Sequence, residues 1–369
     1  MNIVWLTKSA AKYKMDLLDE IGKKVNLTIL FIEHKNKNRA AGFYSDLNGH
    51  YQLVQLKSFK QADEYIKNAD IFVDSYYASK WGFYCTGVAR KYHVHTILQA
   101  DGGIAVKRNI LVEMAISCFM NRHEFILSSS TFTDDYFKYY LKNNMKKTYH
   151  YRISSLHEQD IQKNKEYFLK KAEYKKELNL KEFTFISVGQ MIPRKGFDIL
   201  LKAYAESGLN DKTKLLMIGG KPYEELISLK KELNLTSAEF IDAIPKYELN
   251  KYYAASDAYV FTTREDIWGL VVNEALSFGL PLISSDNCVA AEHFSKNENV
   301  GILVKNEDIS GFAKAMVEVY ESIELRNQLS NDALDKIKYY TIEQSAKDIV
   351  DAFNNINEKK CEKVGKIIR

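Results

Sequence analysis

Cysteine, proline and long apolar runs are scarce in this 369-residue chain, and each scarcity excludes a class of protein. The four prolines are spread thinly, which argues against a disordered or fibrous chain. The four cysteines, Cys85, Cys118, Cys288 and Cys361, form no Cys-x-x-Cys pair, which argues against a disulfide framework or a cysteine zinc site. No stretch free of acidic and basic residues exceeds 11 residues, whereas a membrane-spanning helix needs about 20 apolar ones. The first residues also lack a basic segment followed by an apolar core, so we expect a cytoplasmic protein.

Several catalytic motifs are absent as well. The chain contains no His-Glu-x-x-His, Asp-x-Asp, Gly-x-Ser-x-Gly, Walker A or Gly-x-Gly-x-x-Gly sequence, which argues against zinc proteases, P-loop NTPases and α/β-hydrolases. His93 and His95 have no third ligand nearby in the sequence, so we expect no metal site. No helix-turn-helix, finger or RNA-binding signature is present, and we expect no nucleic-acid partner.

The composition is that of a globular protein, with 46% apolar and 27% charged residues. The charge is uneven. Residues 1–180 hold 28 Lys and Arg against 19 Asp and Glu, and residues 181–369 hold 24 against 29. A basic half suits an anionic membrane surface or an anionic substrate, although solvated surface lysines explain it equally well.

Short apolar strands alternate with amphipathic helical stretches in both halves, which predicts an α/β fold with two doubly wound parallel sheets. The predicted strands are 3–6, 27–32, 53–56, 70–74, 96–99, 124–127, 183–188, 215–218, 239–241, 258–262, 282–285 and 301–304. In the first half, the predicted helices are 15–22, 60–67, 81–91, 107–120 and 133–142.

The Lys- and Glu-rich run 162–179 has no strand pattern and predicts the boundary between domains. We expect an N-terminal acceptor-binding domain at 1–172 and a nucleotide-sugar-binding domain at 173–342. Residues 343–369 are expected to form a C-terminal helix that packs back on the N-terminal domain. Ligands of open parallel sheets bind beyond the carboxyl ends of the strands, so two such sheets suggest a ligand site between the domains.

The most informative segment is residues 262–285, T-T-R-E-D-I-W-G-L-V-V-N-E-A-L-S-F-G-L-P-L-I-S-S. A strand runs into a charged loop, and a helix is predicted from Gly269 to a stop before Pro281. A phosphate would bind the free amides at the positive end of this helix, around Trp268, Gly269, Leu270 and Val271. Glu274, about one turn into the helix, either accepts both hydroxyls of a ribose or is an exposed helix charge.

A second segment, residues 187–204, has the same strand, turn and helix order. The predicted strand leads through Gly189 into a loop that carries Arg194 and Lys195. Gly196 allows a close backbone approach before the next helix. Arg would bind a diphosphate through its planar guanidinium and Lys as a point charge. The alternative is an ordinary solvated loop.

Together the two segments resemble the C-terminal domain of the family 4 glycosyltransferases, which have the two-Rossmann GT-B fold with a central cleft. The resemblance covers residues 183–301, and the pattern G-L-x-x-x-E-A-x-x-x-G-x-P at 269–281 carries most of it. In that family a G-R…K-G loop contacts the donor diphosphate. Here Lys195 and Gly196 match, Gln190 stands at the arginine position, and Arg194 would supply the missing charge.

The resemblance also implies the rest of the donor site. The family's E-x7-E element binds the donor sugar and the nucleotide ribose. Glu274 matches its second acid, and the first falls on Asp266, with Glu265 beside it as the alternative. The further residues that the resemblance places near the donor are Gly189, Gly219, Gly220 and, in the loop that meets the nucleobase, Ile244.

The first half resembles the family only faintly, because the glycine-rich turn expected after the first strand is missing. Its clearest candidate is Asp101 in H-T-I-L-Q-A-D-G-G, residues 95–103, at the end of a predicted strand. We interpret Asp101 as a catalytic residue that holds a donor or acceptor hydroxyl, or acts as a base. The alternative is a helix N-cap.

These patterns predict a nucleotide-sugar-dependent glycosyltransferase of polysaccharide or glycoconjugate biosynthesis at the cell envelope. Family resemblance implies retaining stereochemistry and catalysis without a metal or other cofactor, by Lys195, Arg194, Asp266 and Asp101. The acceptor would be a glycan, a lipid-linked sugar or a protein. The alternatives are a nucleotide-sugar epimerase on the same fold and a non-catalytic sugar-nucleotide-binding subunit.

Two stretches of the basic half, 107–120 and 136–147, mix cations with large apolar side chains. Basic residues attract anionic lipid and exposed aromatic residues settle at the bilayer interface, which predicts docking at the inner face of a membrane. The alternative is that the same apolar side chains face the domain core.

Overall fold

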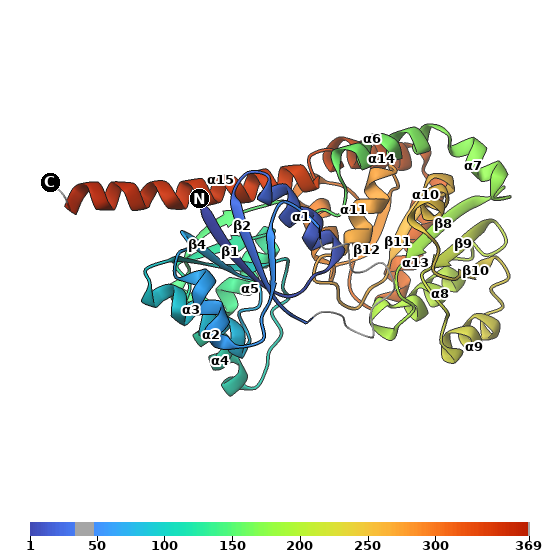
Figure 1. The fold of residues 1–369 in the computed structure, drawn as a ribbon. Helices are drawn as coiled ribbons and strands as arrows, with labels where there is room; N and C mark the ends of the chain where they lie inside the picture. Colours follow the sequence, from blue (N-terminus) through green and yellow to red (C-terminus); the bar gives the residue numbers. More distant parts are fainter. Residues whose placement is uncertain (34–47, 368–369) are drawn as a thin grey trace. The chain divides into compact units, whose positions relative to one another are not determined.

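The computed structural model describes residues 1–33 and 48–367. The chain divides into two compact units, Met1–Ser155 with Ile342–Arg369, and Leu156–Thr341. Each unit is a parallel sheet with helices packed on it (Figure 1). The division lies before α6 (Glu158–Leu169), earlier than residues 172 and 173, because α6 packs against α10 (Lys246–Ala255) of the second unit.

The first unit contains a seven-stranded sheet in the order β3-β2-β1-β4-β5-β6-β7, and the neighbouring strands run parallel. Its strands are β1 (Asn2–Ser9), β2 (Asn26–Glu33), β3 (Gln52–Gln55), β4 (Ile71–Asp74), β5 (His95–Ala100), β6 (Phe125–Ser128) and β7 (Lys147–His150). Its helices are α1 (Lys12–Gly22), α2 (Phe59–Ile66), α3 (Lys80–Lys91), α4 (Ile110–Asn121), α5 (Thr131–Leu141), the 3-10 turn Lys142–Asn144 and α15 (Ile342–Ile367).

Helix α15 belongs to the first unit although it ends the chain. It packs on α1, and Phe353 meets Trp5 of β1 edge to face with ring centroids 6.4 Å apart. Asp348 accepts hydrogen bonds from the backbone and the guanidinium of Arg152, both at 3.2 Å. Trp5 and Phe353 are both fully buried, and burial of each ring stabilises the packing of α15 on the first unit by about 1.5 to 3 kcal/mol.

The second unit contains a six-stranded sheet in the order β10-β9-β8-β11-β12-β13, again with parallel neighbours. Its strands are β8 (Phe183–Val188), β9 (Thr213–Ile218), β10 (Ala238–Ile241), β11 (Ala258–Phe261), β12 (Leu282–Ser285) and β13 (Ile302–Val304). Its other helices are α7 (Lys171–Glu177), the 3-10 turn Pro193–Lys195, α8 (Phe197–Glu206), α9 (Glu224–Glu232), α11 (Leu270–Ser277), α12 (Val289–Glu298), α13 (Ile309–Glu321) and α14 (Ile323–Ile337).

Both sheets are covered on two faces, which explains why their strands are apolar runs instead of alternating patterns. Phe185, Leu215, Val260 and Ile283, one from each of four adjacent strands, are fully buried in the second unit. The prediction of two doubly wound parallel sheets is therefore confirmed, and each predicted strand overlaps a strand of the structure.

Strand β7 was not predicted. It is an edge strand that pairs only with β6 among the described residues, and its four residues, Lys-Thr-Tyr-His, are exposed or half-buried. Such a strand needs no apolar run, so the sequence carried no signal for it. Within the part of the chain that the structure describes, no helix is both long enough and apolar enough to cross a bilayer.

Candidate functional site

The predicted donor residues gather at one edge of the second sheet. Because its strands are parallel, the loops that follow β8, β9, β10, β11 and β12 all leave from the same edge. The chain starts this sheet at β8, extends it on one side through β9 and β10, and returns to the other side at β11. The topological switch point, where open parallel sheets bind ligands, therefore lies between β8 and β11.

The loop after β8 forms the first wall of this edge. It passes Gly189 and the exposed Gln190, makes a 3-10 turn at Pro193–Lys195, and enters α8 through Gly196. Gly196 has φ +68°, and a Cβ there would lie 2.0 Å from the carbonyl oxygen of Thr262. Only glycine fits this crossing, where the loops after β8 and β11 touch.

Lys195 reaches across the switch point to the loop after β11. Its Nζ forms an ion pair with Oδ2 of Asp266, and it also lies 5.0 Å from the centre of the Phe261 ring. The two charged side chains are only 12% and 16% exposed. A cation and an acid predicted from separate segments, 71 residues apart, are thus brought together. Glu265 is exposed, and its carbonyl oxygen accepts a hydrogen bond from the Thr263 hydroxyl.

Arg194 ties the same two loops together through the backbone. Its guanidinium donates to the carbonyl oxygen of Glu265, and its own carbonyl accepts hydrogen bonds from Arg264 N at 2.9 Å and from the Thr263 hydroxyl at 3.2 Å. The Arg194 side chain is exposed, as a residue that meets a ligand from solvent would be.

Arg264, which the sequence analysis did not single out, holds this edge in shape. It binds Asp198 of α8 with two hydrogen bonds of 2.9 and 2.8 Å, and Glu307 with one of 2.7 Å. Burial alone raises the pKa of Asp198, but the hydrogen bonds and charge of Arg264 outweigh it, so the pKa of this carboxyl is lowered. The only signal for Arg264 was its place in the charged loop T-T-R-E-D.

Helix α11 begins at the switch point as predicted. Its N-cap, Gly269, has φ +91°, and a Cβ there would lie 2.6 Å from Sγ of Cys288. The amides of Leu270 and Val271 are in the first turn, where a helix offers them no carbonyl partner. The Trp268 side chain is buried instead of facing the edge, and its indole N–H donates to Asn273 at 2.9 Å.

Glu274 lies one turn further along α11 and is half-buried. The hydroxyl of Tyr253 lies 3.3 Å from its Oε2. Burial, followed by the nearby Glu274 charge, raises the pKa of Tyr253 well above its ordinary value, and the same causes act on Tyr259. Both phenols therefore stay protonated, and Tyr253 can donate to the carboxylate of Glu274 and orient it.

The remaining predicted donor residues line the neighbouring strand ends. Gly219 and Gly220 follow β9, and Gly219 packs so closely on Gly189 that a Cβ would lie 2.1 Å from the Gly189 carbonyl oxygen. Ile244 is half-buried in the loop after β10. Cys288, after β12, is fully buried, and this burial raises the pKa of its thiol to about 12.

A family model of the glycosyl transferases group 1 matches residues 170–336, which covers most of the second unit. This unit belongs to the group 1 glycosyl transferases. The matched range holds the loops that carry Lys195, Asp266 and Glu274 at the switch point.

Curated relatives agree with this match. The chain is 27% identical over 168 residues to an uncharacterized glycosyltransferase of Haemophilus influenzae, covering 45% of this chain and 47% of that protein. It is 25% identical over 173 residues, 47% of each chain, to a Campylobacter jejuni N-acetylgalactosamine-N,N'-diacetylbacillosaminyl-diphospho-undecaprenol 4-alpha-N-acetylgalactosaminyltransferase. The chain thus spans about half the length of the curated relatives it matches.

Solved structures extend the likeness to the first unit. Anabaena HepE in complex with UDP has a TM-score of 0.79 at 13% identity, over 96% of this chain and 100% of that one. The lipopolysaccharide glycosyltransferase WaaG has a TM-score of 0.64 at 13% identity, over 95% and 99%. At this identity the likeness shows the fold alone, which is the two-Rossmann GT-B fold predicted from the sequence.

Asp101 lies in the first unit, outside the group 1 glycosyl transferase match. Its Oδ1 accepts hydrogen bonds from Gln99 at 2.6 Å and Tyr151 at 3.0 Å. Its Oδ2 accepts from Tyr13 at 3.1 Å and from the ammonium of Lys14 at 3.2 Å. A carboxylate has about four acceptor positions, so a ligand hydroxyl would share this carboxylate with one of these donors or replace it.

The helix N-cap alternative for Asp101 is wrong. Helix α4 begins at Ile110 instead of 107, and the side chain of Asn109 caps it by accepting from the Leu111 amide at 2.9 Å. Residues 102–109 separate Asp101 from this helix without regular structure.

We expect Asp101→Asn to lower the free energy of unfolding of the first unit by about 1.5 to 3 kcal/mol at pH 7. Burial alone raises the pKa of Asp101, but the Lys14 charge and the hydrogen bonds outweigh it, so the pKa lies below its ordinary value of 3.8. The ionised group therefore stabilises the fold above pH 4, and this contribution is lost as the pH falls through the lowered pKa.

The measurement is urea unfolding at pH 7 and at pH 3. Hydrogen exchange of the β5 peptide monitors the unfolding of the first unit. The difference between Asp101→Asn and the unmodified protein should shrink at the lower pH. Asp135→Asn is the control, because Asp135 is 71% exposed in the same unit. Equal stability of Asp101→Asn and the unmodified protein at pH 7 would show that the network contributes nothing.

Proposed function

We propose that this chain is a nucleotide-sugar-dependent glycosyltransferase of family 4 with its donor site at the switch point of the second sheet. The observation that carries the proposal is the meeting of Lys195 and Asp266 between β8 and β11, beside the first turn of α11. The cations and the first-turn amides there suit the diphosphate of a nucleotide sugar, and the carboxylates of Asp266 and Glu274 suit its sugar and its ribose.

In this proposal the protein itself neutralises the leaving diphosphate. Lys195, Arg194 and the amides of Leu270 and Val271 stabilise the negative charge that grows as the glycosidic bond breaks, which is electrostatic catalysis of the transition state. With these groups in place we expect no metal and no other cofactor. Asp266 orients Lys195 through their ion pair and would meet the sugar of the donor.

The other predicted residues take roles that suit their positions. The carboxylate of Glu274, oriented by Tyr253, would accept the ribose hydroxyls. Gly189, Gly219 and Gly220 would leave room for the donor, and Ile244 would line the nucleobase pocket. The sheet edge of the first unit that holds Asp101 would bind the acceptor, and transfer would proceed with retention.

The names of two relatives support an acceptor class. The Campylobacter relative acts, by its name, on a diphospho-undecaprenol-linked sugar, and a Rhizobium meliloti relative, 26% identical over 145 residues, is named for lipopolysaccharide core biosynthesis. We therefore propose a glycan or lipid-linked acceptor in cell-envelope glycoconjugate biosynthesis, at the cytoplasmic face of the membrane.

The test is a panel of nucleotide sugars with glycan and polyprenyl-diphosphate-sugar acceptors, read as release of nucleoside diphosphate and as a new glycoside. Acceptor-dependent release that persists with a chelator supports the proposal. Conversion of the donor sugar without acceptor would identify an epimerase. Binding of a donor without release under any acceptor would identify a non-catalytic subunit.

A further inference from the structure

Helix α4 of the first unit is apolar in sequence yet projects its apolar side chains into solvent. Nine of its twelve residues are Ile, Leu, Val, Met, Ala, Cys or Phe, but only Met120 is buried. Ile110, Leu111 and Met114 are 69%, 71% and 63% exposed. A helix that covers a sheet normally turns such residues toward the core. The interpretation of this stretch as a core-facing helix is therefore wrong for these three side chains.

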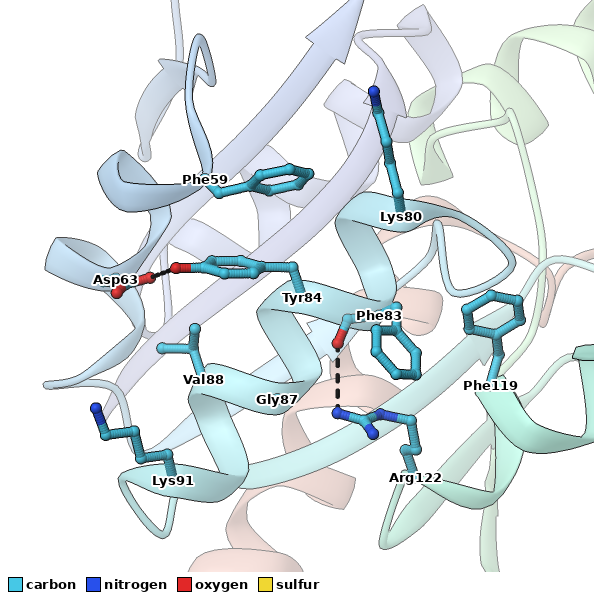
Figure 2. Close-up of a pocket in the computed structure, with 10 residues that line it drawn as sticks. All are labelled: Phe59, Asp63, Lys80, Phe83, Tyr84, Gly87, Val88, Lys91, Phe119 and Arg122. Carbon is cyan, nitrogen blue, oxygen red and sulfur yellow. Dashed lines mark hydrogen bonds between the residues drawn. The ribbon is translucent and has the colours of Figure 1, made fainter.

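Two open grooves adjoin α4. One, of about 760 Å³, lies over α2 and α3 and reaches α4 at its end, where Phe119 and Arg122 meet Phe83 of α3 (Figure 2). The other, of about 570 Å³, runs along α4 and the end of α5 and includes Met114 and Tyr139. Figure 1 shows α4 at the outer end of this unit, near α2 and α3.

The charges around α4 are mainly positive. The cations of the two grooves and of the loop before the helix are Lys80, Lys91, Lys107, Arg108, Arg122 and Lys142. The grooves contain two acids, and both already accept hydrogen bonds from tyrosines: Asp63 from Tyr84 at 2.9 Å and Glu113 from Tyr139 at 2.6 Å. Apolar side chains surrounded by cations complement a surface that is apolar inside and anionic outside.

We propose that α4 is a membrane-docking helix that inserts Ile110, Leu111 and Met114 into the interface of an anionic bilayer. The surrounding lysines and arginines would contact lipid phosphates. The larger groove, lined by Phe59, Phe83 and Phe119, would hold part of an acyl chain. Docking would bring the first unit to a lipid-linked acceptor. This inference goes beyond the proposed function and does not depend on donor chemistry, so vesicle binding and donor binding can fail separately.

The first experiment is co-sedimentation of the full chain with vesicles of about 40% phosphatidylglycerol in phosphatidylcholine and with pure phosphatidylcholine. We expect binding to the anionic vesicles that weakens as salt rises from about 50 to 500 mM, because surface charges are screened. Absence of binding to the anionic vesicles at low salt would overturn the proposal.

The decisive variant is Ile110→Ser, Leu111→Ser, Met114→Ser. Its partition coefficient on anionic vesicles should fall about tenfold or more, with stability unchanged because these side chains are exposed. The matched control is Leu169→Ser, Ile227→Ser, Ile323→Ser, which removes three apolar side chains that are 75%, 49% and 55% exposed in the second unit. The control should bind like the unmodified protein.

Two results would contradict the assignment of α4. Equal vesicle binding by the α4 variant and the control would move the docking surface elsewhere. A dimer in light scattering that becomes monomeric only in the α4 variant, without vesicle binding by either protein, would make this face an interface between copies of the chain.

Discussion

Lys195→Ala is expected to lower kcat/KM for sugar transfer about 100- to 1,000-fold, the usual cost of removing one preorganised group that stabilises charge in a transition state. Lys195 is positioned by Asp266 and is only 12% exposed, so water replaces its ammonium poorly. Its effect grows as the diphosphate departs, and we therefore expect a larger loss in kcat than in donor affinity. Steady-state kinetics with donor and acceptor varied separately measures both.

The kinetics of Lys195→Ala need two comparisons. Lys181→Ala removes an exposed lysine just before β8, at the amino ends of the strands and so at the opposite edge of the sheet, and should have normal activity. Lys195→Arg keeps the charge and should retain more activity than the alanine variant. Turnover of a folded Lys195→Ala protein at the level of the unmodified protein would show that this loop is ordinary surface.

Glu274→Gln is expected to weaken donor binding by about 1.5 to 3 kcal/mol, or about 10- to 150-fold in Kd. The substitution keeps the size of the side chain and an acceptor for the Tyr253 hydroxyl, but removes the charge that strengthens hydrogen bonds from a ribose diol. Stability should change little for the same reason. Isothermal titration with the donor, or with its nucleoside diphosphate, measures the loss directly.

Glu232→Gln is the matched control for Glu274→Gln. It neutralises an exposed carboxylate on α9 of the same unit and should leave the Kd unchanged. If the Glu274→Gln protein is folded and its donor Kd equals that of the unmodified protein, Glu274 does not bind the ribose.

The fold was predictable because both sheets are buried on two faces. Burial requires strands such as Phe183–Val188 to be apolar runs, and the helices between them keep a helical period. The alternation of strands and helices can therefore be recognised in the sequence. Strand β7 was not predicted because it is a polar strand at the edge of the sheet. The predicted boundary lies later than residues 155 and 156, because α6 and α7 carry a solvated Lys- and Glu-rich surface although they pack on α10.

The site was predictable only where a local pattern carries it. The positive φ of Gly196 and Gly269 and the start of α11 follow from turn and helix-start signals in short segments. Pairs that are distant in sequence leave no such signal. Asp198 is held by Arg264 across 66 residues and Asp101 by Lys14 across 87. For α4 the sequence left two interpretations open, because its apolar side chains suit either a domain core or, beside the cations of the basic half, a membrane surface.

The central claim is that the carboxyl edge of the second sheet binds a nucleotide sugar through Lys195 and Glu274. A thermal-shift panel of nucleotide sugars tests it most directly, because a ligand at 100 times its Kd adds about 2.7 kcal/mol of stability. We predict that at least one nucleotide sugar raises the Tm of the unmodified protein, that its free nucleoside does so less, and that Lys195→Ala and Glu274→Gln shrink the shift. No shift with any nucleotide sugar, or the same shift in both variants, would contradict the claim.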